Sequence, residues 1–142
     1  MYLDRMDDLF AEVGVNPQIS TVPFDRVNRL PRTEGVYIIH DAHRVIYVGQ
    51  ASGRGGIRAR FQPHHVNKAR GTCVTPEGRR ISGDGQGWQE GRSESWWLPD
   101  TWRVEYVKVE SAVARTYLEG AIMWRLKPYA NDECYQDRHL TE

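Results

Sequence analysis

The pattern of hydrophobic and polar residues predicts helices in the first part of the chain. Apolar residues recur at helical spacing over residues 2–13 and stop at Gly14, which is typical of an amphipathic helix and its C-terminal end. Residues 15–22 have an extended character. A short helix is expected over residues 24–30, because Pro31 cannot continue it.

A β-hairpin is predicted next. Residues 35–40 and 45–50 are rich in β-branched and aromatic side chains, and the four residues between them are polar and few enough to connect antiparallel strands. Residues 51–56 read as a flexible glycine-rich loop that leads into a helix from Ile57.

The second half of the chain begins with an irregular segment. Residues 71–101 show no period of 2 or 3.6, and a stretch of this length inside a compact domain is usually functional. Residues 102–109 then alternate like a half-buried strand. Ser111 is a plausible N-cap for a helix over residues 112–126, which Lys127 and Pro128 end.

Together these elements predict one α/β (α+β) domain over residues 1–142, with 71–101 as an insertion. A small three-stranded, mostly antiparallel sheet with helices packed on it is the expected architecture. Hydrophobic residues make up 39% and charged residues 27% of the chain, as in ordinary globular proteins. No apolar run approaches the roughly 18 to 20 residues of a membrane span, and the acidic N-terminus does not resemble a signal peptide, so a cytoplasmic location is expected.

The formal net charge is zero, but the positive charges are unevenly distributed. Residues 51–93 contain eight Arg or Lys and three acidic residues, whereas residues 1–34 contain four and six, and residues 94–142 six and nine. A neutral protein with its positive charge in one stretch can still present a phosphate-binding face. A solvated basic loop would explain the same pattern.

Two short motifs in the hairpin resemble a known family. Gly35-Val36-Tyr37 and Tyr47-Val48-Gly49, with their tyrosines ten residues apart, are similar to the paired motif of the GIY-YIG nucleases. The lead-in at residues 30–37 resembles that of the nuclease domain of the excision-repair protein UvrC.

The resemblance continues to about residue 131. Ile57 is followed by Arg60 and then, four residues later, by His64, as in many members of the family. Glu119, a Lys-Pro pair and Asn131 resemble the end of the family domain. Each motif is weak alone, but their order and spacing together are specific.

The resemblance implies a metal-dependent endonuclease, and the residue types suit phosphodiester hydrolysis. Tyr37 is the expected acceptor of the proton of the attacking water, and Tyr47 would orient that water or hold the phosphate. A phenol needs positive neighbours to act as a base near neutral pH, and Arg60, His64 and a metal would supply them. Arg60 can also grip phosphate oxygens with its planar guanidinium.

Glu119 is the expected ligand of one Mg²⁺, for which Mn²⁺ can substitute, with waters and phosphate oxygens completing the shell. Gly35, Gly49 and Asn131 are expected to support the site structurally. DNA is the expected partner. Because a single site cuts one strand, double-strand cleavage would need a homodimer or two successive binding events. The expected DNA-binding residues are Arg54, Arg58, Lys68, Arg70, Arg79 and Arg80.

Several alternatives stay open at this stage. Either tyrosine alone would more often be a core aromatic, Arg58 competes with Arg60, and His65 competes with His64. An acid such as Glu119 on an apolar helix is often paired, here with Arg115. The 71–101 segment, with Trp88, Trp96 and Trp97, serves either as a DNA-recognition element or as a loop that covers the core.

If the segment recognises DNA, a restriction or phage-defence endonuclease is favoured. A structure-specific repair or recombination nuclease and a catalytically inactive DNA-binding module are the alternatives.

Overall fold

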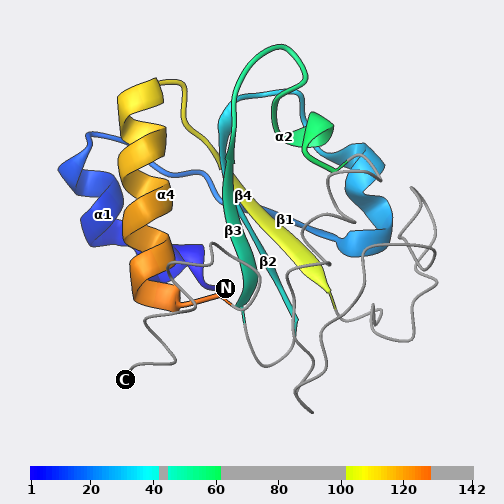
Figure 1. The fold of residues 1–142 in the computed structure, drawn as a ribbon, viewed down its shortest axis with the longest axis horizontal. Coiled ribbons are helices and arrows are strands. Elements are labelled where there is room, and N and C mark those ends of the chain that lie inside the picture. Colours follow the sequence, from blue (N-terminus) through cyan, green and yellow to red (C-terminus); the bar gives the residue numbers. More distant parts are fainter. Residues whose placement is uncertain (42–44, 62–101, 129–142) are drawn as a thin grey trace.

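The computed structural model describes residues 1–41, 45–61 and 102–128, which form a mixed α+β fold. Helices cover both faces of a central sheet (Figure 1). The elements in chain order are η1 (Leu3–Arg5), α1 (Asp7–Glu12), β1 (Ser20–Pro23), η2 (Phe24–Arg29), β2 (Gly35–His40), β3 (Val45–Ala51), α2 (Gly56–Ala59), β4 (Arg103–Lys108) and α4 (Ala112–Leu126).

The sheet of the described residues has four strands in the order β1-β4-β2-β3, and all neighbours are antiparallel. The expected count of three is wrong, because β1 pairs with β4 from Ser20 to Pro23. The sequence showed only extended character there, since a four-residue edge strand is too short for a clear alternation.

The N-terminal segment is also more broken than the sequence predicts. Instead of one helix over residues 2–13, a 3₁₀ turn (η1) precedes a six-residue α1, and the two are separated at Met6. Their apolar side chains still face the sheet, so the predicted apolar face is right although the helix is not continuous. The predicted hairpin, the short helix after Pro23 and the strand that precedes α4 are confirmed.

The core is divided in two by the sheet. On one face α1, η1 and α4 pack through Leu3, Phe10, Leu118 and Ile122. On the other face η2 and α2 pack against the sheet around Phe24 and the residues that follow it. Because both faces are covered, β2 is buried along nearly its whole length, and its side chains alternate between the two cores.

The last helix follows the predicted boundaries. Ser111 accepts a hydrogen bond from the backbone N–H of Ala114 at 3.2 Å, and Lys127 ends the helix in the left-handed conformation with φ of 52°. α4 therefore packs firmly against the sheet and contacts β3 and β2. None of the helices among the described residues is long and apolar enough to cross a membrane.

β3 contains an irregularity that determines the direction of its side chains. His40 pairs with Val45 and Ile39 with Tyr47, so that Ile46 is an extra residue on β3. Ile46 and Tyr47 consequently lie on the same side of the sheet although they are consecutive.

Candidate active site

The two motif tyrosines lie together on adjacent strands. The rings of Tyr37 on β2 and Tyr47 on β3 are stacked, with centroids 6.0 Å apart and an interplanar angle of 27°. The edge of Phe61 closes the other side of the Tyr37 ring at 5.0 Å. Tyr37 is fully buried, whereas Tyr47 is partly exposed. The two stacked phenol rings therefore extend from the buried core to the surface.

Two motif glycines are required by close packing. Gly49 lies opposite Tyr37, and a Cβ atom there would lie 2.6 Å from the Cζ and hydroxyl oxygen of Tyr37. At Gly35 a Cβ atom would lie 2.1 Å from the carbonyl oxygen of Val107 on β4. Both glycines thus support the site, as the sequence predicts.

Arg60 comes directly after α2. Its positive charge lowers the pKa of both tyrosines, which places the guanidinium within electrostatic range of their hydroxyls. Its Nε is buried and has no hydrogen-bond partner in the structure of the described residues. Since a buried unpaired donor costs about 1–3 kcal/mol, this atom indicates an interaction that the described residues do not provide.

Burial dominates the acid–base properties of the tyrosines. It raises the pKa of Tyr37 far above the ordinary value of 10, the neighbouring Tyr47 raises it further, and the hydrogen bond and charge of Arg60 only partly oppose this. The pKa of Tyr47 is also raised by burial, although Arg60 opposes this. Arg60 alone therefore does not offset burial, which favours the protonated phenol of Tyr37, and the further positive charge expected from His64 and a metal stays a prediction.

Glu119 reaches the same place from α4, on the opposite face of the sheet. Its carboxylate raises the pKa of both tyrosines, which places it within electrostatic range of both hydroxyls. Gln50 on β3 donates a hydrogen bond from Nε2 to Oε1 of Glu119 at 3.2 Å. The site is thus built around β3, an edge strand of the described sheet, with groups from both faces.

The alternative pairing of Glu119 with Arg115 is wrong. Arg115 is buried and donates instead to the carbonyl oxygens of Val109 at 3.1 Å and Glu110 at 2.7 Å. It also lies 3.4 Å from the carboxylate of Glu34. Arg115 therefore holds the start of α4 against the end of β4, and Glu119 remains directed to the site.

Arg58 does not compete with Arg60 for the tyrosines. Its Nε donates to the carbonyl oxygen of Leu30 at 2.6 Å, so that it ties α2 to the segment before β2. The backbone N–H groups of Ile57 and Arg58 bond to the carbonyls of Thr33 and Pro31 in the same region. Arg54 is exposed in the loop between β3 and α2. His64, His65, Lys68, Arg70, Arg79, Arg80, Asn131 and the 71–101 segment lie outside the described residues.

Two residues of the site were not predicted from the sequence. Gln50 follows Gly49, and the alternation of a strand places its side chain on the α4 face, where it meets Glu119. Gly56, in the loop expected to be flexible, has φ of +52°, and a Cβ atom there would lie 2.4 Å from the carbonyl oxygen of Thr33. Gly56 thus allows the close packing of α2 that positions Arg60.

A second polar cluster lies away from the tyrosines. The fully buried carboxylate of Glu105 on β4 accepts hydrogen bonds from the backbone N–H groups of Tyr2 and Leu3, both at 2.9 Å. His40 Nε2 lies 2.9 Å from Glu105, close enough for an ion pair although not aligned for a regular hydrogen bond. An open pocket of about 500 Å³ lies beside this pair.

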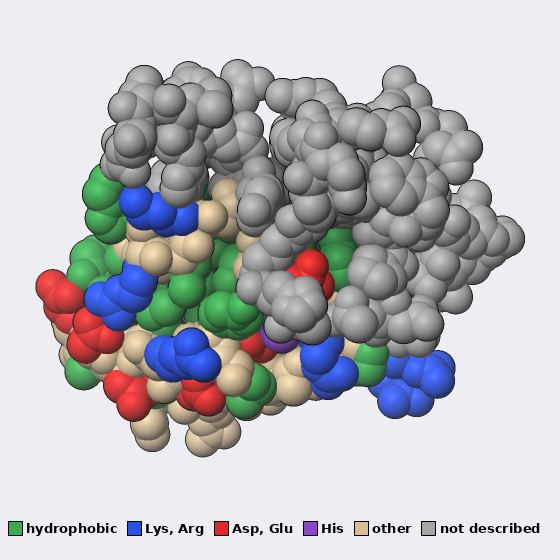
Figure 2. Space-filling view, turned by 90° about the horizontal axis from the view of Figure 1, so that it is seen from below, with side chains coloured by type: hydrophobic (Ala, Val, Ile, Leu, Met, Phe, Trp, Pro, Cys, Tyr) green, Lys and Arg blue, Asp and Glu red, His purple; other side chains and the backbone are tan. Residues whose placement is uncertain are grey.

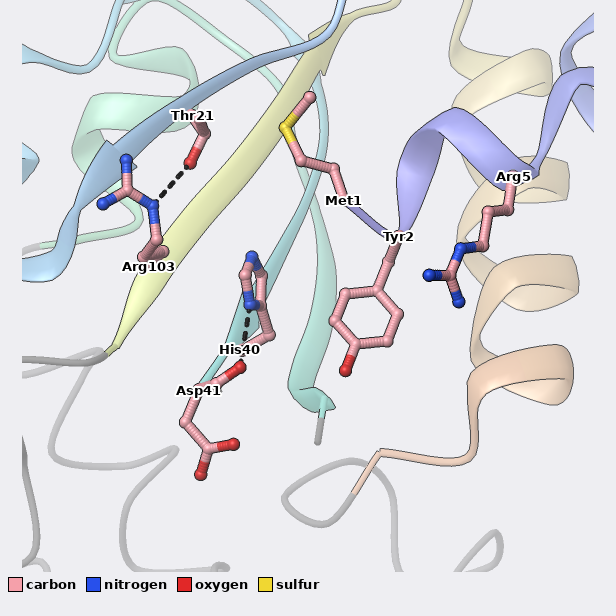
Figure 3. Close-up of a pocket in the computed structure, with 7 residues that line it drawn as sticks. All are labelled: Met1, Tyr2, Arg5, Thr21, His40, Asp41 and Arg103. Carbon is pink, nitrogen blue, oxygen red and sulfur yellow. Dashed lines mark hydrogen bonds between the residues drawn. The ribbon is translucent and has the colours of Figure 1, made fainter. Parts of the chain in front are cut away.

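Figure 3 shows how this pocket is lined. Arg103 donates from Nε to Thr21 at 3.2 Å, and Arg5 lies on the other side of Tyr2. The arginines do not point toward one another. The cluster is therefore an anchor for the N-terminal segment rather than a site for a single anion.

The described residues do not form one continuous basic surface on the face seen in Figure 2, where Lys and Arg side chains are interspersed with acidic and apolar ones. No group of three or more His, Cys, Asp and Glu side chains that could hold a metal occurs among the described residues. Glu119 is the only carboxylate described at the tyrosines, which suits a cation that keeps most of its waters.

No protein-family model, curated protein or solved structure matches this chain. The resemblance to GIY-YIG nucleases therefore rests on the motif residues themselves.

Proposed function

We propose that this protein is a metal-dependent DNA endonuclease that hydrolyses one phosphodiester bond per site. The observations that carry the proposal are the stacked rings of Tyr37 and Tyr47 and the influence of the charges of Arg60 and Glu119 on the pKa of both phenols. In a purely structural cluster, the polar groups would be expected to satisfy one another's hydrogen bonds. Here Nε of Arg60 is buried with no hydrogen-bond partner among the described residues.

In this proposal each group has a separate role. Arg60 binds the phosphate oxygens and offsets the charge that develops on them. Glu119, oriented by Gln50, holds one Mg²⁺, or Mn²⁺ in its place. When bound, the cation supplies positive charge at the phosphate and acidifies a water. The half-exposed Tyr47 orients the phosphate or the water.

Tyr37 would accept the proton of the attacking water. The water oxygen bonds to phosphorus, the P–O ester bond breaks, and the leaving oxygen takes a proton from solvent or a second acid. Only the phenolate of Tyr37 can accept that proton, so the phenol must first lose its own proton to solvent. Burial, Tyr47 and the charge of Glu119 all oppose the phenolate, whereas Arg60 favours it, so this role requires further positive charge at the site. As a neutral phenol, Tyr37 would only hold the water by a hydrogen bond.

A DNA-binding module without catalysis is the second candidate, and the raised pKa of Tyr37 favours it. The preference for a restriction or phage-defence enzyme over a structure-specific repair nuclease depends on the 71–101 segment. The substrate separates these two, because a restriction enzyme gives discrete fragments of plasmid, whereas a structure-specific enzyme prefers flaps or forks.

Nicking of supercoiled plasmid with and without Mg²⁺ tests the proposal. We expect Glu119→Gln to lower the nicking rate by at least about two orders of magnitude while DNA binding is retained, since a transition-state contact is lost. Glu12→Gln, an exposed change on α1, is the matched control and should cut normally. Mg²⁺-independent cutting, or equal rates for the two variants, would contradict the enzyme proposal. Binding by wild type without any nicking would favour the second candidate.

A further inference from the structure

The outer face of α4 carries an apolar stripe that the protein's own core does not use. Val113 is 82% exposed, Trp124 52% and Tyr117 38%, and they are three of the four large hydrophobic side chains exposed among the described residues. Gly120 lies between them and is also exposed. We call these four residues the α4 stripe. The opposite side of α4 packs on the sheet, so the helix has two apolar faces.

The spacing of the α4 stripe is that of a coiled-coil seam. Its residues are separated by four, three and four positions, which corresponds to consecutive d, a, d and a positions of a heptad. Such a pattern on a helix that already has a buried face indicates a second helix as its partner.

Gly120 supplies an independent reason for this partner. Glycine inside a helix costs stability relative to alanine, and a Cβ atom at Gly120 would have no atom within 4 Å. The described residues therefore do not require a glycine here, and the open space at Gly120 would accept a large side chain from a partner.

The stripe is complementary to itself in the antiparallel direction. If two copies of α4 cross at a two-fold axis between positions 118 and 119, Tyr117 of one copy faces Gly120 of the other, and Val113 faces Trp124. A large side chain thus meets a small one in each layer.

We propose that the α4 stripe binds α4 of a second copy of this chain, antiparallel and with two-fold symmetry. The contacts already made within the chain are compatible with this arrangement. The hydroxyl of Tyr117 bonds to Glu12 and the ammonium of Lys127 lies 5.4 Å from the Trp124 ring centroid, which orients both rings without covering them. The proposal does not depend on the nuclease function.

The dimer should be weak. α4 has 15 residues and is therefore about 22 Å long, and one helix pair of this length buries less area than a standard stable interface. We expect dissociation in the micromolar range, so sedimentation velocity from about 1 μM to about 500 μM covers the transition.

Gly120→Lys is the decisive variant, because it fills the space that Tyr117 of the second copy would occupy, and its Cβ atom would have no atom within 4 Å. We expect its dimer dissociation constant to rise at least about tenfold while its circular dichroism and melting curve stay those of a folded protein. Ala112→Lys adds the same charge on an exposed position outside the stripe and should dimerise like wild type.

The outer layer gives a second test. Val113→Lys should weaken the dimer as Gly120→Lys does, because it places a charge where Val113 faces the Trp124 ring of the second copy. A wild type that stays monomeric at the highest concentration overturns the proposal. So does a dimer that Gly120→Lys or Val113→Lys leaves unchanged, which would place the interface elsewhere.

Discussion

Gly49 lies directly beneath the ring and hydroxyl of Tyr37, and this single contact links the packing of the hairpin to the chemistry of the site. The phenol can only be buried and stacked on Tyr47 because its cross-strand neighbour has no side chain. Its protonation follows from the same burial, which outweighs the nearby guanidinium of Arg60. At this position structure and reactivity cannot be changed separately.

Gly49→Ala should therefore affect both the stability of the fold and the reactivity of the site. The new methyl group would force the Tyr37 ring against Phe61, and overpacking of this kind costs about 1–3 kcal/mol of unfolding free energy. Urea denaturation measures the loss. Gly120→Ala, at a helical position with open space, should instead gain about 0.5–1 kcal/mol. Equal changes in the free energy of unfolding for the two alanine variants would show that the contact between Gly49 and Tyr37 is not tight.

At the scale of elements, α4 presents the carboxylate of Glu119 and β3 presents Gln50, which binds it. β2 and β3 present the two tyrosines, and Arg60 follows α2. The position of Glu119 depends on the start of α4, which Ser111 caps and Arg115 ties to the end of β4. The site thus depends on a helix end that lies two turns away from it.

Ser111→Ala should remove the cap and destabilise the protein by about 1 kcal/mol, as measured by thermal or urea unfolding. The fold and nicking at low temperature should persist, because the helix still packs on the sheet. Thr116→Ala, an exposed change within α4, is the control and should be neutral or slightly stabilising. A neutral Ser111→Ala would mean that the hydrogen bond to Ala114 contributes nothing.

The sequence predicts these elements unequally well. α4 was predicted closely because a capping serine, a helical period and a Lys-Pro end agree. β1 was missed as a strand because it takes its pairing from β4 rather than from its own pattern. In the site, motif spacing identified the residues, but no spacing could reveal that burial outweighs Arg60 at Tyr37 or that Gln50 holds Glu119.

For the whole molecule, the buried Glu105 joins the N-terminal segment to the middle of the sheet. Burial raises the pKa of this carboxyl, but the bond with His40 and the two backbone N–H groups outweigh burial and lower it below 4.5. Burial lowers the pKa of His40, yet the contact with Glu105 and the Asp41 carbonyl raises it above 6.5 overall. The charged forms of both groups are therefore favoured by folding.

The pH dependence of stability follows from these directions. The Glu105 contribution is complete above pH 4.5 and is lost as the pH falls through its lowered pKa. The His40 contribution is complete below pH 6.5 and is lost as the pH rises through its raised pKa. The pair should stabilise the fold most between these two pH values. The free energy of unfolding of wild type, measured with urea, should therefore decrease toward pH 8. In His40→Asn this alkaline decline should be smaller; an identical decline would mean that other groups cause it.

The extra residue at Ile46 keeps the two tyrosines in phase. Counted from the pair of His40 and Val45, Tyr47 would fall on the same side as Glu119 in a regular ladder, and the bulge brings it into phase with Tyr37. Removal of Ile46 would leave a regular ladder with the same partners, because His40 would still pair with Val45 and Ile39 with the tyrosine. The bulge thus absorbs one residue of strand length without turning the tyrosine to the other face, although Ile46 carries no reactive group.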